Sequence, residues 1–223
     1  MMPFDGGVES PGNATFIFSC GAALLYGTMA AAPPRFVASL VKTLAVALLA
    51  VLAAMQGGHW LLVLALALSA AGDLFLSRPG EKAFLAGLAS FLAAHIAYIV
   101  LFATIGGGFA LLAAQPWRGA AAAVLTVYGL VMLVLLWRRI GPELRLPVAV
   151  YIVAILGMGI SALTLDAPLV IFGALLFIVS DTLLAGEKFL LPAISRYRDR
   201  MRYAVWGTYY LGQLAITLGL IRF

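Results

Sequence analysis

The sequence predicts an all-α integral membrane protein in which eight transmembrane helices form one bundle. Of its 223 residues, 64% are hydrophobic and only 10% are charged, which is unusual for a soluble fold of this size. The apolar residues fall into eight runs, and each approaches the roughly 20 residues that a helix needs to cross a bilayer. The basic residues gather in every second connection between these runs, as positive charge does on the cytoplasmic side of a membrane.

Four apolar runs occupy the first half of the chain. Residues 1–13 are rich in Gly and Pro and carry only acidic charge, so they predict a short exposed tail before a membrane domain that covers 14–223. No basic residue precedes the first run, which argues against a cleaved signal peptide. Each run ends at Pro, Gly or charged residues, which terminate helices, as at Pro33-Pro34. The predicted spans are 14–32, 36–54, 59–76 and 83–105.

Four more runs follow a predicted loop that holds the glycine run Gly106-Gly107-Gly108 and Pro116. The basic pair Arg138-Arg139 ends the first of them, and Glu187-Lys188 ends the third. A basic segment over 196–202 leads into the last run. The predicted spans are 118–137, 146–165, 168–186 and 203–221.

The 14 basic residues give the predicted orientation. Eleven lie in the odd-numbered connections: Arg35, Arg78, Lys82, Arg138, Arg139, Arg145, Lys188, Arg196, Arg198, Arg200 and Arg202. Arg118 and Arg222 lie on the other side, and Lys42 lies inside a span. This asymmetry predicts a multi-pass protein of a bacterial-type inner membrane with both termini outside the cytoplasm. The net charge of +5 then reflects topology and membrane lipids rather than a nucleic-acid partner.

Two aspartates, Asp73 and Asp181, interrupt apolar runs at matching places in the third and seventh spans. Ionisable side chains inside a bilayer are costly unless they face a protein interior or a water-filled cavity. An ion pair with Lys42, or capping of a helix end, would explain one aspartate but not both. The matching places are consistent with two parallel four-helix repeats, which would bring the two aspartate helices face to face.

Two carboxylates in one cavity repel each other, so one keeps its proton while the other ionises. General acid and base chemistry needs such a pair, and so does a proton-coupled transporter. The aspartates alone therefore leave an enzyme and a small-molecule or lipid transporter open.

Other polar side chains share helix faces at a spacing of three or four residues. The pairs are Ser69 with Asp73, His95 with Tyr98, and Tyr209 with Gln213. Each pair is able to point at a common interior, or merely to bond a neighbouring helix.

Lys42 and His95 are the two other ionisable side chains that we consider as site residues inside the predicted spans. Lys42 lies about two turns into its span, so it reaches either the membrane surface or a phosphate or carboxylate in the cavity. His95 lies deeper and is either a neutral, hydrogen-bonded histidine or a group that handles protons or orients substrate.

Several other kinds of site are absent from the sequence. It has no Gly-x-Ser-x-Gly elbow and no phosphate-binding Gly-Lys-Ser/Thr loop. Two histidines and the single Cys20 are too few for a usual zinc site, so we expect no metal and no cofactor. Nothing points to an obligate protein partner.

At these residues the chain resembles the YhhN-like family of membrane lysoplasmalogenases, over about residue 42 to the C-terminus. The matching motifs are Ser69-x-x-Gly72-Asp73, Phe91-Leu92-x-x-His95-x-x-Tyr98, Gly173-Ala174-Leu175-Leu176-Phe177-Ile178-x-Ser180-Asp181 and Tyr209-x-x-Gly212-Gln213. The chain departs from the family where Thr43 follows Lys42, since the family commonly has Lys-Pro there.

The resemblance implies a hydrolase that cleaves the vinyl ether bond of lysoplasmalogens to a fatty aldehyde and glycerophosphoethanolamine or glycerophosphocholine. It implies Asp73 and Asp181 as the catalytic pair, one as acid and the other as base. Its candidates for substrate binding are Lys42, Ser69, His95, Tyr98, Tyr209 and Gln213. A lysophospholipid would enter from the inner leaflet, with its phosphate near Lys42 or Arg78.

Overall fold

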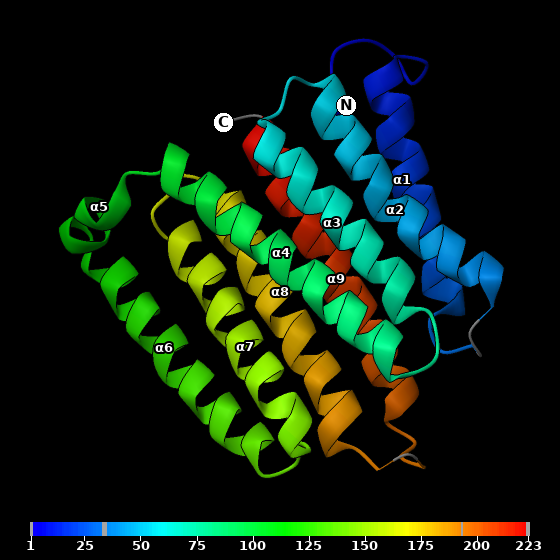
Figure 1. The fold of residues 1–223 in the computed structure, drawn as a ribbon. Helices are drawn as coiled ribbons and strands as arrows, with labels where there is room; N and C mark the ends of the chain where they lie inside the picture. Colours follow the sequence, from blue (N-terminus) through cyan, green and yellow to red (C-terminus); the bar gives the residue numbers. More distant parts are fainter. Residues whose placement is uncertain (1, 33–34, 193, 222–223) are drawn as a thin grey trace.

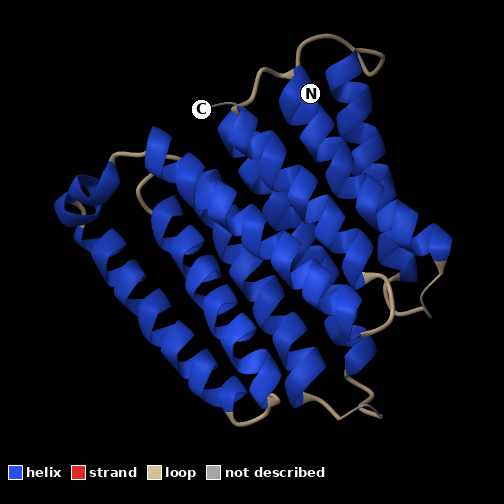
Figure 2. Ribbon diagram, viewed as in Figure 1, coloured by secondary structure: helices blue, strands red, loops and turns tan. Residues whose placement is uncertain are grey.

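The computed structural model describes residues 2–32, 35–192 and 194–221, and every regular element in these ranges is helical (Figures 1 and 2). The elements are α1 (Pro11–Met29), α2 (Phe36–Met55), α3 (Trp60–Leu76), α4 (Glu81–Ile105), α5 (Gly108–Ala114), α6 (Pro116–Trp137), α7 (Pro142–Ala162), α8 (Pro168–Ala185), the π-helical turn η1 (Gly186–Leu190) and α9 (Arg198–Ile221). The all-α prediction is confirmed.

The long helices coincide with the eight predicted apolar runs, and the differences lie at their ends. The largest is at α9, which begins at Arg198 because the basic segment already continues the helix. The first helix begins at Pro11, three residues early, where Ser10 caps it by accepting a hydrogen bond from the backbone N–H of Asn13. The residues before it are mostly exposed, whereas Asn13, which the prediction placed in the exposed tail, lies in the first turn of α1 and is buried.

The loop prediction over the glycine run was wrong in part. Gly106 and Gly107 do connect two helices, but Gly108 begins the short helix α5. Its φ of +61° is a conformation that glycine adopts readily, which allows the chain to turn sharply there. Figure 1 shows α5 at the edge of the bundle, between α4 and α6.

Six helices of the described part are long and apolar enough to cross a membrane: α2, α4, α6, α7, α8 with η1, and α9. The apolar helix α3 is shorter, with 17 residues. Many of the exposed side chains on these helices are large and apolar, such as Val124 and Val131 on α6. Helices with such outward faces are stable in lipid, so the protein is a multi-pass membrane protein.

The two ends of the bundle differ in charge. The start of α1 and the end of α9 lie at one end, and the α1–α2, α3–α4, α6–α7 and α8–α9 connections lie at the other (Figure 1). The eleven basic residues counted above belong to this second end or flank it. Pro33, Pro34 and Arg222 lie outside the described residues.

Arg118 is the exception in this charge pattern, and its contacts explain its place. It is buried, and its Nη1 donates to the backbone carbonyls of Leu163 and Leu165 just after α7. A cation there satisfies carbonyl groups that the helix leaves without partners. Arg118 is therefore a structural residue.

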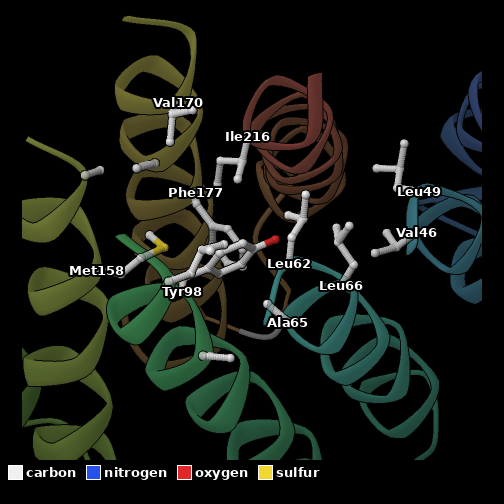
Figure 3. Packing of buried hydrophobic residues seen from close by; sticks show 14 of the residues in the cluster. Val46, Leu49, Leu62, Ala65, Leu66, Tyr98, Met158, Val170, Phe177 and Ile216 are labelled. Atoms are coloured by element: carbon white, nitrogen blue, oxygen red, sulfur yellow. The ribbon is translucent and has the colours of Figure 1, made fainter. Parts of the chain in front are cut away.

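The hydrophobic core lies between α2, α3, α4, α7, α8 and α9. Figure 3 shows Leu62 and Leu66 of α3 facing Tyr98 of α4, with Phe177 of α8 and Ile216 of α9 close by. The most extensive helix pairs are α8 with α9 and α3 with α4. On α3 and α8, the core residues lie farther from the basic end of the bundle than the two aspartates do, and they hold the aspartate helices in place.

Candidate functional site

Asp73 and Asp181 line the same cavity, which holds about 390 Å³. Each lies about one turn from the end of its helix, Asp73 on α3 and Asp181 on α8. Basic side chains line the outer part of the cavity, so we call it the polar cavity. The fold therefore brings the two predicted carboxylates to one chamber at the basic end of the bundle.

Close helix crossings hold each aspartate helix against a neighbour, α8 against α9 and α3 against α4. A Cβ atom on Gly173 of α8 would lie 2.7 Å from the carbonyl oxygen of Gly212 on α9. A Cβ atom on Gly72 would lie 2.6 Å from the ring of Phe91. Since only glycine has no Cβ, it allows backbones to approach this closely in membrane helices. These glycines belong to the sequence motifs quoted above and set the spacing of the site.

Asp73 is engaged at both carboxylate oxygens. The Nζ of Lys42 lies 2.9 Å from Oδ1, and the Tyr209 hydroxyl donates to Oδ2 at 2.7 Å. Asp73 is 1% exposed and Lys42 is 16% exposed. Lys42 thus binds a carboxylate inside the cavity and does not reach for the membrane surface. Both partners hold Asp73 in a fixed position.

Asp181 has a different environment. The Tyr151 hydroxyl donates to its Oδ2 at 2.6 Å, and the Nε2 of His95 lies 3.9 Å from the same oxygen. The Asp181 side chain is 14% exposed. In the described part of the chain, no hydrogen bond engages Oδ1. Asp181 is therefore the carboxylate with an oxygen open to the cavity.

The contacts of His95 fix which ring nitrogen carries the proton. Its Nδ1 lies 2.6 Å from the carbonyl oxygen of Phe91, and a carbonyl only accepts, so Nδ1 is the donor. In the neutral ring, Nε2 is then the acceptor nitrogen; it faces Asp181 and has no hydrogen-bond partner in the described part of the chain. The ring is fully buried between Tyr151 and Phe177.

Tyr151 is the site residue that sequence reasoning missed. It lies on α7, in the middle of an apolar run, just as Tyr98 lies on α4. A tyrosine inside an apolar run is a signal that the sequence does contain, but Tyr151 has no polar residue three or four positions away to mark a shared polar face.

Tyr98 and Gln213 lie deeper than the aspartates. The Tyr98 hydroxyl donates to Oε1 of Gln213 at 2.6 Å, and both side chains are fully buried. This bond joins α4 to α9 in the way that polar residues often join membrane helices. Neither residue is among the described residues that line the polar cavity.

Ser69 shares its helix face with Asp73, as predicted, one turn farther from the basic end. It is fully buried, and it is not among the described residues that line the polar cavity. Ser180, next to Asp181, does line it and donates to the carbonyl of Val205 on α9.

Five cationic side chains line the outer part of the polar cavity: Arg35, Arg78, Lys188, Arg198 and Arg202. Glu187 pairs with Arg198 at 2.8 Å and with Arg202 at 3.2 Å. The other three form no salt bridge in the described part of the chain. They leave a positive rim that suits an anionic group.

Among the described residues, no group of three or more His, Cys, Asp or Glu side chains is arranged to hold a metal ion. The chemistry that this site offers is proton transfer by carboxylates, with Tyr, Lys and His side chains that orient them.

The chain is similar to known proteins over most of its length. The profile of the YhhN family matches residues 37–220. A protein of Mycobacterium bovis named lysoplasmalogenase is 35% identical over 194 residues, which cover 83% of this chain and 69% of that protein. The human protein named lysoplasmalogenase TMEM86B is 35% identical over 192 residues, which cover 83% of this chain and 76% of that protein. No solved structure matches the chain significantly.

Proposed function

Because the chain belongs to the YhhN family, we propose that it is a membrane lysoplasmalogenase that hydrolyses the vinyl ether bond of lysoplasmalogens. The products are a fatty aldehyde and a glycerophospho head group. The observation that carries this proposal is the pair of carboxylates in one cavity, one fixed by Lys42 and one open on Oδ1. The transporter alternative is not favoured, because the relatives carry the name of an enzyme.

Vinyl ether hydrolysis starts with a proton transfer to carbon. The alkene carbon that is not bonded to oxygen takes the proton, and the other alkene carbon and the ether oxygen then share the positive charge. Water attacks that second carbon and loses a proton, which gives a hemiacetal. The hemiacetal collapses to the aldehyde and an alcohol, so one water is consumed and no proton is gained or lost.

We assign the proton donation to Asp181. Its Oδ1 is open to the cavity, whereas both oxygens of Asp73 are occupied by Lys42 and Tyr209. Asp73 stays ionised beside the Lys42 ammonium, faces the developing cation and accepts the proton of the attacking water. Paired carboxylates divide the work in this way in glycoside hydrolysis.

Tyr151 and His95 act as positioning residues for Asp181 in this scheme. The Tyr151 hydroxyl holds Oδ2, which turns Oδ1 toward the substrate. His95 offers Nε2 as an acceptor near the same carboxyl group.

The head group is assigned to the outer part of the polar cavity. Because Lys42 already pairs with Asp73, we assign phosphate binding to Arg35, Arg78 and Lys188. The positive end of the bundle belongs in the cytoplasm by the distribution of basic residues, so the lysolipid enters from the inner leaflet and both termini lie outside.

This topology requires that α1 and the 17-residue α3 cross the membrane as well, which makes eight spans. A helix of 17 residues is about 25 Å long, slightly less than the hydrocarbon thickness, and local thinning of the bilayer accommodates it. Two parallel repeats, α1 to α4 and α6 to α9, are supported by packing: α4 packs on α7 and α2 on α9, contacts that such a symmetry would exchange.

The purified protein in detergent tests the proposed activity. We expect aldehyde release from a lysoplasmalogen and none from the matching lysolipid with a saturated ether, because protonation on carbon requires the double bond. In D2O, one deuterium should enter the carbon next to the aldehyde group when the product is trapped at once. Absence of aldehyde with the wild-type protein would refute the activity, and aldehyde without deuterium would refute the mechanism.

A further inference from the structure

A second cavity of about 90 Å³ lies among α4, α6, α7 and α8. Its wall consists mostly of aliphatic and aromatic side chains, among them Met132 of α6 and Ile152 of α7. We call it the apolar cavity. A wall of this kind suits a hydrocarbon and offers little to a charged group.

The apolar and polar cavities meet at Asp181, which lines both. Leu76, Phe84, Phe91, Leu184 and Lys188 also belong to both walls. A molecule that occupies the two cavities together would thus have an apolar part on one side of Asp181 and a polar part on the other.

We propose that the apolar cavity binds the first carbons of the alkenyl chain of the lysolipid, while its glycerophosphate part lies in the polar cavity. This inference rests on the proposed function and adds the direction in which the substrate lies. The opposite direction would place hydrocarbon among Arg and Lys side chains and phosphate among Met and Ile side chains, which is unfavourable for both.

The roles proposed for the two aspartates require this direction, because Asp181 lines both cavities and Asp73 lines only the polar one. The carbon that takes the proton lies on the chain side of the ether oxygen. With the chain in the apolar cavity, that carbon lies at the junction of the two cavities, beside the Asp181 carboxyl group. The ether oxygen and the attacking water then lie on the polar side, toward Asp73 and Lys42.

The size of the apolar cavity limits how much of the chain it holds. A dry protein cavity of about 150 Å³ binds benzene, which has six carbons, so the present cavity holds roughly four carbons. The remainder of the chain leaves past α6, which lies at the edge of the bundle and exposes apolar side chains to lipid (Figure 1).

Two neighbouring positions on α6 allow a matched test. Met132 lines the apolar cavity, whereas Val131 does not line it and is 50% exposed. Met132→Trp fills the cavity, and Val131→Trp adds the same side chain on the lipid side. The substrates are a lysoplasmalogen with a 16-carbon alkenyl chain and an analogue with a three-carbon propenyl chain.

Each buried methylene raises the affinity roughly fourfold, so a variant that displaces two methylenes from the cavity should lower the affinity more than about tenfold. We expect Met132→Trp to lower kcat/KM for the long chain by roughly tenfold or more, and for the propenyl analogue by less than about threefold. Val131→Trp should change neither. Equal losses on both substrates, no loss with Met132→Trp, or the same loss with Val131→Trp would overturn the proposal.

Cross-linking separates this proposal from the activity. The probe is a saturated ether lysolipid with a diazirine on the fourth chain carbon, which is bound but not cleaved. We expect wild-type cross-links in 128–132 of α6 and 151–156 of α7, reduced at least about fivefold by Met132→Trp. Cross-links only in α2 or α9, or cross-links that Met132→Trp leaves unchanged, would refute the chain position even if the enzyme is active. A wild-type protein that cross-links as expected but releases no aldehyde would refute the activity alone.

Discussion

Lys42 and Asp73 form an ion pair that joins α2 to α3 inside the bundle, with Nζ 2.9 Å from Oδ1. Asp73 is almost fully buried, so each charge depends on the other for its stability. Asp181 lines the same cavity without a lysine or arginine partner in the described part of the chain. This asymmetry between two similar aspartates leads to the first three predictions.

Asp181→Asn should remove the proton donor and lower kcat by roughly 100- to 10,000-fold, the range in which general acids contribute. The KM should change little, because the side chain keeps its size. Aldehyde release measures kcat, and thermal unfolding checks that the variant is folded. An Asp181→Asn enzyme that retains more than a tenth of the wild-type rate would exclude Asp181 as the donor.

Lys42→Met should lower the free energy of unfolding by about 3–5 kcal/mol, because it leaves a buried carboxylate without its cation. Combining it with Asp73→Asn should recover most of that loss, since the second change removes the unpaired charge. Unfolding midpoints of the wild type, both single variants and the double variant in detergent measure the coupling. Additive effects would show that the two residues do not stabilise each other.

Tyr151→Phe should lower kcat by roughly ten- to a hundredfold, because it removes the hydroxyl that holds Oδ2 of Asp181. Tyr203→Phe is the control, since Tyr203 is exposed and does not line the polar cavity. Equal activities of the two variants would mean that the Tyr151 hydroxyl does not position the carboxylate.

Gly212→Ala should destabilise the fold by about 1–3 kcal/mol, because the new Cβ would lie 2.9 Å from the carbonyl oxygen of Gly173. Gly207→Ala on the same helix has no neighbouring atom within 4 Å and should be neutral or slightly stabilising. The two unfolding midpoints in detergent test whether the α8–α9 crossing is as close as the structure has it. A Gly212→Ala midpoint at or above that of Gly207→Ala would contradict it.

Arg78→Gln should raise the KM for lysoplasmalogen by roughly tenfold, because it removes a cation from the rim that is assigned to the phosphate. The kcat should change little. Arg139→Gln, at an exposed position of the same end of the bundle, should leave KM unchanged. If Arg78→Gln raises the KM for an analogue without phosphate by the same factor, Arg78 does not bind the phosphate.

The sequence by itself determined the helices, the pairing of two aspartates and the charge asymmetry of the two ends. These features depend on local composition: apolar length sets a span, Pro and Gly end it, and basic residues in short connections gather at one end. The ends of α2 and α3 were accordingly predicted to within one residue, whereas the cap of α1 and the helix α5 were missed.

The tertiary structure decided which side chains meet. Lys42 stands beside Asp73, Tyr209 binds that same aspartate, and Tyr151 holds Asp181, although nothing in helical spacing connects these residues. The apolar cavity likewise exists only where four helices converge. The physical reason is that the sequence of a helix sets which residues share a face, but not which neighbour that face contacts. Packing between helices, such as the close approach of Gly173 to Gly212, decides the neighbour and the rotation of the helix about its axis.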